Sequence, residues 1–464
     1  MAAALRLLRG TWGIAVIFAD HPGTIIAARS GSPVIIGRAA HGNFVASDLN
    51  ALAGFASRAV ALEDGEIAVL TADDVELHHL TSGKRSRPET PLEVTAVAAE
   101  RGEYEHFMLK EIFEQPEAIG NTLRGRLLPE EGNAKLTGLD LSPRELAAID
   151  RIVIAGCGSS LHAGLIGEYY FEEIAGIPAE VEQAAEFRYR NPIVRPNTLV
   201  LPISQSGETA DTIAAVREAR QKGALVAALS NVVGSTIARE CGRGLYLHAG
   251  PEISVASTKT FTCQVVALWL LALRFGRNRR LGCTGGQALV RELEALPEQI
   301  SRVLDLAPEI RRIAEKYAGF EHFFFIGRGP LYPAAREGAL KLKEISYVFA
   351  DGCHAAELKH GPISLLGPAT PVIALANRGP GHDKLLGNIA ECRARRSPVI
   401  ALATTGDDET GTLADDLVAL PEASAYATPI LDVVALQLFA YYFARQRKCE
   451  IDQPRNLAKS VTVE

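Results

Sequence analysis

One layout of apolar runs and glycine loops occurs twice in this chain, about 172 residues apart. The run IVIAGCGSS around Gly156 pairs with FFFIGRGPL around Gly327, and three further runs pair in the same order at nearly the same offset. In each copy short apolar runs alternate with helical stretches, the pattern of βαβ units and a parallel sheet. The repeat therefore predicts two tandem α/β domains with doubly wound parallel sheets, over 142–285 and 310–453.

The two copies differ most in the loop after the second matching run. The first copy has SQSGET there, and the second has ANRGPG. Small hydroxyl residues and a glycine between a strand and a helix gather N–H and O–H donors at a helix N-terminus, which suits a phosphate. An ordinary capped helix start explains the same residues equally well. The candidate phosphate-binding segment is therefore the loop 204–209.

Two further segments of the first copy are expected to face the same ligand. Ser160 follows the first predicted strand, and loops at the carboxyl ends of parallel strands converge on one crevice. The segment from Val255 to Lys259 opens a further helix and is expected to close the pocket. The Gly-x-Gly at Gly156 is not a full dinucleotide fingerprint, and the sequence predicts no cofactor and no metal.

The second copy supplies titratable residues in REGALKLKEISY. Glu337, Lys341 and Glu344 lie at i, i+4 and i+7 and share one helical face. A surface stripe of salt bridges is the commoner explanation of this spacing, but the apolar neighbours leave little of the helix for solvent. His360 follows in ELKHGP. A buried Glu near a Lys and a His is an acid/base set that can move protons between adjacent carbons.

Composition narrows the class of protein. The chain is 47% hydrophobic with a net charge of −7 and no basic run, which argues against a nucleic-acid partner. Seven cysteines without a C-x-x-C pair indicate reduced thiols, and we predict a cytoplasmic protein. The apolar run VVALWLLAL at 265–273 is too short to span a membrane and predicts a buried helix.

The first part of the chain has a different pattern. Residues 1–95 are predicted to be β-rich, with a hairpin at His21-Pro22-Gly23 and a strand pair around Glu63-Asp64-Gly65. Residues 96–141 are predicted to form a linker and a helical segment that ends at Gln115-Pro116.

At this level of detail a family resemblance is clear. The segments SQSGETADT, EISVASTKTFT, EGALKLKEISY, ELKHGP and DQPRNLAKSVTVE resemble the isomerase half of the glutamine–fructose-6-phosphate aminotransferases. The resemblance covers essentially the whole chain. It implies two flavodoxin-like sugar-isomerase (SIS) domains that convert fructose 6-phosphate and an amine donor to glucosamine 6-phosphate.

The resemblance also implies a role for each matching residue. Phosphate binding would fall to Ser204, Gln205, Ser206 and Thr209, and sugar binding to Ser160, Val255 and Ser257. Glu344 would carry the proton between C1 and C2, helped by Lys341 on the helical face that also holds Glu337. His360 would open the sugar ring from the neighbouring subunit of a homodimer. Lys459, in a C-terminal tail over 454–464, would form a Schiff base with the ketose.

The chain departs from the family pattern at its start. The family's type-2 glutaminase domain opens with a nucleophilic Cys directly after Met, whereas residue 2 here is Ala and the first cysteine is Cys157. Residues 1–95 thus resemble a truncated remnant of that domain, from a shortened gene product or a misplaced start. We expect no glutaminase activity and a possible separate ammonia source. Alternatives are an ammonia-dependent sugar-phosphate aminase or deglycase, and a non-catalytic sugar-phosphate sensor.

Overall fold

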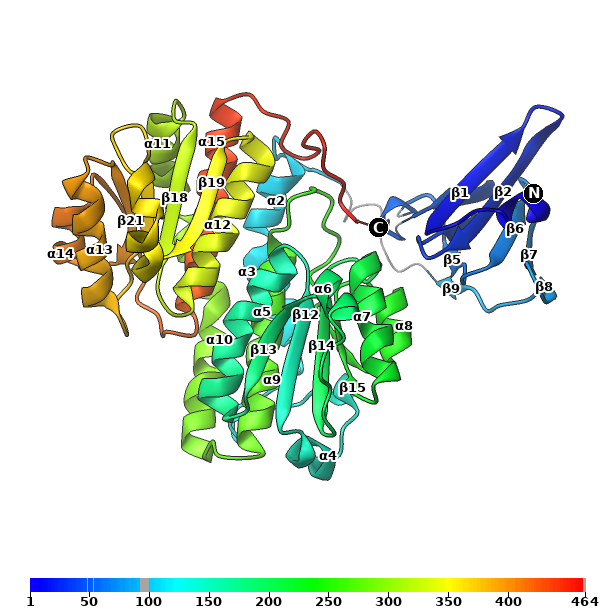
Figure 1. The fold of residues 1–464 in the computed structure, drawn as a ribbon, viewed down its shortest axis with the longest axis horizontal. Coiled ribbons are helices and arrows are strands. Elements are labelled where there is room, and N and C mark those ends of the chain that lie inside the picture. The colour runs from blue at the N-terminus through cyan, green and yellow to red at the C-terminus, as the bar shows by residue number, and fades with distance from the viewer. Residues whose placement is uncertain (48, 53, 92–99, 462–464) are drawn as a thin grey trace.

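A computed structural model describes residues 1–47, 49–52, 54–91 and 100–461. It contains an N-terminal β-rich unit at one end, drawn in blue, and two α/β domains (Figure 1). The first α/β domain is mainly green, and the second runs from yellow-green to red. The C-terminal tail leaves the second domain and runs toward the first (Figure 1).

Both α/β domains have the same five-strand order. The first sheet runs β13 (Ala179–Gln183), β12 (Arg151–Gly156), β14 (Thr198–Ser204), β16 (Ala228–Ser230) and β17 (Gly244–Tyr246), with β15 (Leu225–Val226) also paired to β14. The second runs β19 (Phe349–His354), β18 (His322–Gly327), β20 (Val372–Leu375), β21 (Val399–Thr404) and β22 (Asp416–Leu420). Every pair in both sheets is parallel. In chain order each sheet reads 2-1-3-4-5, the flavodoxin-like arrangement, so the predicted repeat of a doubly wound domain is confirmed.

A shared layer of helices joins the two sheets. It is built from α5 (Ser159–Tyr170), α9 (Lys259–Arg277), α12 (Leu331–Ser346) and α15 (Thr428–Gln446), with α12 packed on both α15 and α5. One hydrophobic core contains buried residues of both domains, including Leu268 of α9 and Leu436 of α15. The run 265–273 is buried in α9, as predicted. In the described residues no helix is long and apolar enough to cross a membrane.

The remaining helices flank this layer or connect its parts. They are α4 (Pro143–Ala148), α6 (Ala184–Tyr189), α7 (Ala210–Gln221), α8 (Thr236–Cys241), α10 (Cys283–Leu304), α11 (Ala307–Tyr317), α13 (His382–Ala394) and α14 (Asp408–Leu413). The segment predicted as one helix ending at Gln115-Pro116 forms two, α2 (Phe107–Phe113) and α3 (Gln115–Leu123). Proline is compatible with the first turn of a helix, so Pro116 starts α3 rather than ending the helical segment.

The N-terminal unit consists of two antiparallel sheets and a short helix, α1 (Ala2–Leu5). One sheet runs β1 (Trp12–Phe18), β2 (His21–Ser30), β6 (Glu66–Leu70), β7 (Val75–His79) and β8 (Gly83–Arg85). The other runs β4 (Gly42–Ala46), β3 (Ile35–Ala39), β5 (Arg58–Ala61) and β9 (Thr90–Pro91). The predicted hairpin forms from β1 and β2, but its turn is at Ala19-Asp20. The predicted turn residues His21-Pro22-Gly23 instead begin β2, beside a shift in the strand register. Strands also flank Glu63-Asp64-Gly65, but β5 and β6 belong to different sheets, so this turn crosses between them.

Helix α2 is fastened to the first α/β domain by a buried carboxyl group. Glu111 Oε1 accepts hydrogen bonds from the backbone N–H groups of Ile253 and Ser254. Glu111 Oε2 is buried without a hydrogen-bond partner among the described residues. Burial is the largest cause that raises the pKa of Glu111 to about 8, and the nearby charge of Glu252 adds to it. The folded protein therefore keeps Glu111 protonated at neutral pH.

We predict that this protonation makes stability depend on pH. An unfolded Glu111 ionises near pH 4.5, whereas the folded one ionises near 8, so its contribution to stability is complete below pH 4.5 and is lost as pH rises toward 8. The loss approaches about 1.4 kcal/mol per pH unit within that window. Glu111→Gln, which cannot ionise, should gain stability relative to wild type as pH rises. Thermal unfolding of both proteins between pH 5 and 9 measures this difference.

Glu117→Gln is the matched control, because Glu117 is an exposed glutamate of the adjacent helix α3. Its difference from wild type should stay nearly constant over the same range. A Glu111→Gln difference that is equally constant would contradict the assignment of a protonated Glu111.

Candidate active site

The SQSGET loop lies where β14 ends and α7 begins. Ser204 Oγ accepts the backbone N–H of Gly207 at 3.0 Å and lies 3.1 Å from Thr209 Oγ1. Ser206 Oγ accepts the backbone N–H of Glu208 at 3.1 Å. Gly207 has a φ of +67°, and an added Cβ would lie 2.0 Å from Ser235 Oγ, so the turn needs glycine. The loop is therefore a fixed turn that places three hydroxyl groups at the start of a helix.

The other predicted sugar-binding residues occupy neighbouring segments of the first domain. Ser160 lies in the first turn of α5, directly after β12, the neighbour of β14 in the sheet. The chain continues from β12 to β13 on one side of the sheet and from β14 to β16 on the other. The edge between β12 and β14 is therefore the topological switch point, where sheets of this kind bind ligands. Ser160 Oγ accepts a hydrogen bond from Gln264 Nε2 of α9 at 3.0 Å. Ser257 lies just before α9 and Thr260 lies inside it, and their hydroxyl oxygens are 2.7 Å apart.

A cluster of charged groups joins the two domains. Glu337 and Lys341 of α12 are fully buried, which excludes the surface-stripe explanation of their spacing. Lys341 Nζ lies 3.4 Å from Glu337 Oε1 and 2.7 Å from Glu344 Oε2. From α5 of the first domain, Ser159 Oγ donates to Glu337 Oε1 at 2.8 Å, and His162 Nδ1 lies 2.8 Å from Glu337 Oε2.

The surroundings of this cluster keep its central pair ionised. Burial on its own raises the pKa of Glu337, but the charge of Lys341 and the hydrogen bonds from His162 and Ser159 outweigh it and lower that pKa. Burial on its own lowers the pKa of Lys341, but the charges of Glu337 and Glu344 outweigh it and raise that pKa well above its usual value. Lys341 is thus a fixed positive charge and not a proton acceptor. The Glu344 side chain is 21% exposed, so part of it is open to solvent.

The end of the chain, from Asp452 onward, is bonded to α2 and to the first domain. Asp452 accepts the backbone N–H groups of Phe107 and Met108 with its carboxylate and that of Val255 with its carbonyl oxygen, each at 2.9 Å. Farther along, the Val461 carbonyl accepts the backbone N–H of Ala210 at 3.2 Å, at the end of the SQSGET loop. The described tail is therefore ordered across the mouth of the first domain. Residues 462–464 of the predicted tail lie outside the described residues.

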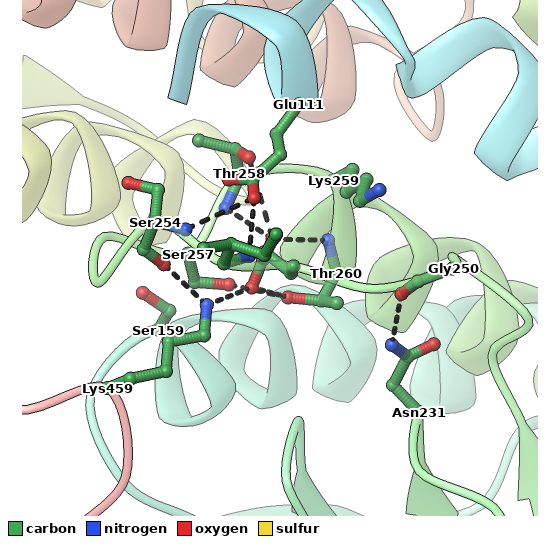
Figure 2. A network of polar contacts seen from close by, with 12 residues as sticks. Glu111, Ser159, Asn231, Gly250, Ser254, Ser257, Thr258, Lys259, Thr260 and Lys459 are labelled. Carbon is green, nitrogen blue, oxygen red and sulfur yellow. Dashed lines mark hydrogen bonds and ion pairs between the residues drawn. The ribbon is translucent and has the colours of Figure 1, made fainter. Parts of the chain in front are cut away.

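Lys459 of this tail reaches a polar network of the first domain. Its Nζ donates to Glu252 Oε2 at 2.8 Å and to the Ser254 carbonyl at 2.7 Å (Figure 2). Ser254 directly precedes Val255, and Ser257 lies in the same segment. Lys459, the predicted Schiff-base residue, therefore bonds to the short segment that carries Val255 and Ser257, two predicted sugar-binding residues.

His360 is not brought to these groups within one chain. It ends a short 3-10 helix of the second domain, Ala355–His360, and is exposed. Across the described ranges no hydrogen bond or ion pair connects it to Glu344 or Lys459. In the same ranges no three His, Cys, Asp or Glu side chains are grouped as a metal site.

Four residues of the site escaped the sequence analysis: Ser159, His162, Glu111 and Glu252. Ser159 and His162 lie three residues apart at the start of a helix, so a shared face was readable, but their partner in α12 was not. Glu111 and Glu252 bond to segments 142 and 207 residues away. No local pattern signals contacts of that length.

Comparisons with known proteins agree with this architecture. The family model described as SIS domain matches residues 145–274 and 317–445. The glutamine–fructose-6-phosphate aminotransferase [isomerizing] of Chlorobaculum tepidum is 47% identical over 461 residues, which is 99% of this chain and 75% of that protein. The Thermus thermophilus protein of the same name is 47% identical over 462 residues, 99% of this chain and 76% of its own.

A solved structure shows the same relationship. The C-terminal domain of glucosamine-fructose-6-phosphate aminotransferase from Francisella tularensis aligns with a TM-score of 0.73 and 35% identity, over 76% of this chain and all of that one. The matched portions include both SIS domains, and the identity to the curated relatives is far above what a shared fold alone produces. The chain therefore belongs to the glutamine–fructose-6-phosphate aminotransferase (isomerizing) family.

Proposed function

We propose that this chain converts fructose 6-phosphate and an amine donor to glucosamine 6-phosphate. The observation that carries the proposal is that direct contacts join the three elements that supply its groups. The tail bonds to the first domain beside the turn, and α5 of that domain bonds to α12. The first SIS domain supplies a turn of hydroxyl groups, the second supplies an ion-paired carboxylate on α12, and the tail supplies the Lys459 amine. A non-catalytic sensor has no need of a buried acid/base cluster or a lysine held beside the sugar-binding segment.

The SQSGET turn is assigned to the substrate phosphate. The hydroxyls of Ser204, Ser206 and Thr209, with the N-terminus of α7, offer donors to a phosphate dianion. Gln205 Nε2 is buried without a hydrogen-bond partner in the described protein, so it is a further available donor. Ser160, Val255 and Ser257 are assigned to the sugar itself.

Glu344 is assigned as the base that carries a proton between C1 and C2. Its Oε2 lies 2.7 Å from Lys341 Nζ, and this ion pair orients the carboxylate. Both oxygens of Glu337 are engaged by Ser159, Lys341 and His162, so we assign Glu337 to positioning Lys341. Glu337 and Lys341 therefore contribute through their charges, whereas Glu344 accepts the proton and returns it.

Lys459 is assigned to the ketone carbon. Its ammonium first gives up one proton to solvent. The neutral nitrogen then adds to C2, and the C2 oxygen leaves as one water with the two remaining nitrogen protons, which forms the imine. His360 is assigned to ring opening from the neighbouring subunit of a homodimer, because a single chain leaves it exposed and apart from the other groups.

The amine donor is assigned to ammonia that other residues or another protein supply. The family nucleophile is a cysteine, and all seven cysteines of these 464 residues lie at position 157 or later. Residues 1–91 have a β-rich fold in the structure, and we propose that they correspond to part of a glutaminase domain.

We predict that the purified 464-residue chain interconverts hexose 6-phosphates and does not release glutamate from glutamine. The isomerase groups are in place, whereas a glutaminase needs its thiol nucleophile. Assays with fructose 6-phosphate alone, with glutamine, and with ammonium salts separate the possibilities. Glucosamine 6-phosphate from ammonium but not from glutamine is the expected product pattern. Glutamate release at enzyme-like rates would refute the assignment.

We also predict that Glu344→Gln lowers kcat by about 10²- to 10⁴-fold, the usual contribution of a general base. The KM for fructose 6-phosphate should change little, because the proposed phosphate turn lies in the other domain. Steady-state kinetics measure both constants. Lys343→Gln is the matched control, since Lys343 lies on the same helix but outside the ion-paired cluster. Near-normal turnover of Glu344→Gln would assign the proton transfer to another group.

The same variant tests the assignment of His360. Glu344→Gln and His360→Ala proteins are each expected to be inactive. The two proteins are then mixed under conditions that exchange subunits. Each hybrid dimer pairs the intact Glu344 of one chain with the intact His360 of the other, so it holds one complete site and activity should return in part. Exchange without any recovered activity would place His360 in the site of its own chain.

A further inference from the structure

Glu252 is a buried carboxylate whose direction is set by its own segment. Its Oε1 accepts the backbone N–H groups of Thr258 at 2.9 Å and Thr260 at 3.1 Å. Its Oε2 accepts the hydroxyl of Thr260 at 2.6 Å. These three donors lie at the start of α9, within eight residues of Glu252. The carboxylate is therefore aimed before the C-terminal tail contributes anything.

The remaining strong partner is the amine of Lys459, 207 residues later in the chain. This amine lies 2.8 Å from Glu252 Oε2 and 2.7 Å from the Ser254 carbonyl oxygen, and Figure 2 shows Lys459 beside Ser254. Burial alone raises the pKa of Glu252, but the Lys459 charge and the hydrogen bonds outweigh it and lower that pKa to about 2. Glu252 is thus ionised at any working pH, and a buried charge of this kind needs a counter-charge.

The neighbouring charges are matched separately. Lys259, at the first position of α9, pairs with Glu114 Oε2 at 2.6 Å. Glu111 accepts two backbone N–H groups of the segment that carries Glu252 and remains protonated at neutral pH. Glu252 is therefore the ionised carboxylate that hydrogen-bonds to the tail amine, and Glu114 serves a different lysine.

We propose that Glu252 is a positioning residue for Lys459, which it fixes beside Val255 and Ser257 and thereby fastens the tail over the sugar site before the ketose arrives. The inference rests on the proposed function for the chemistry of the amine. The fastening itself rests only on the contacts of Glu252, Lys459 and Ser254.

Trypsin cleavage after Arg455, which lies in the tail, tests the fastening without any measurement of activity. Glu252→Gln removes the charge with little change in size, and Lys459→Gln removes the amine from the other side. Each should speed cleavage after Arg455 by about tenfold or more, as expected when a local opening becomes easier. The double variant should cleave no faster than either single variant, because both remove the same interaction.

Two controls keep this test interpretable. Glu114→Gln removes the neighbouring carboxylate that pairs with Lys259 and should leave the cleavage rate within about twofold of wild type. Thermal unfolding checks that each variant is folded. If Glu252→Gln does not fold, Lys459→Gln and Glu114→Gln still decide between a specific anchor and a general loss of order. Unchanged cleavage in Lys459→Gln, or additive effects in the double variant, would overturn the proposal.

Borohydride trapping with fructose 6-phosphate separates this inference from the proposed function. Wild type should gain a reduced sugar adduct on Lys459, and Glu252→Gln should gain at least about tenfold less. If wild type forms no adduct while the cleavage effects are non-additive, the imine chemistry fails and the positioning role stands. Equal trapping in wild type and Glu252→Gln would overturn the positioning role itself.

Discussion

The buried ion pair of α12, Glu337 with Lys341, and its hydrogen bonds to α5 are the interaction on which the site depends. Glu337 and Lys341 lie on the second SIS domain, and Ser159 and His162 of the first domain complete their hydrogen bonds. Buried charges are costly, and loss of one partner from such a pair typically costs about 3–5 kcal/mol. These contacts join the two domains at the point where we propose that Glu344 meets a sugar held by the other domain.

The two SIS copies have the same topology but use equivalent loops differently. In the first copy the SQSGET turn holds the hydroxyls of Ser204, Ser206 and Thr209 between the end of β14 and the start of α7. In the second, the matching Asn377 is buried and donates to both carboxylate oxygens of Asp432, at 2.9 and 2.8 Å. Burial raises the pKa of Asp432 well above its usual value, despite the opposing hydrogen bond from Asn377. Asn377 of the second loop therefore makes hydrogen bonds inside its own domain. The contribution that we propose for this domain comes instead from Glu344 on α12.

The sequence predicted the parts of this molecule that follow from periodic patterns. The repeat, the parallel sheets and the buried helix α9 all rest on local alternation of apolar residues. The sequence could not predict contacts between distant segments, such as Glu252 with Lys459. It also could not predict to which sheet each strand belongs, as for the two strands that flank Glu63-Asp64-Gly65. The face shared by Glu337, Lys341 and Glu344 was readable from spacing, but its burial required the partner helix α5. The assigned roles of these residues remain predictions.

We propose that one substrate is held by the first SIS domain while groups from the second domain and the tail act on it. A crystal structure of the chain with fructose 6-phosphate tests it most directly. The claim predicts a phosphate bonded to the hydroxyls of Ser204, Ser206 and Thr209, with C1 or C2 within about 3.2 Å of a Glu344 oxygen. A sugar phosphate bound instead at the loop 376–379, or bound in the first domain but away from Glu344, would contradict it.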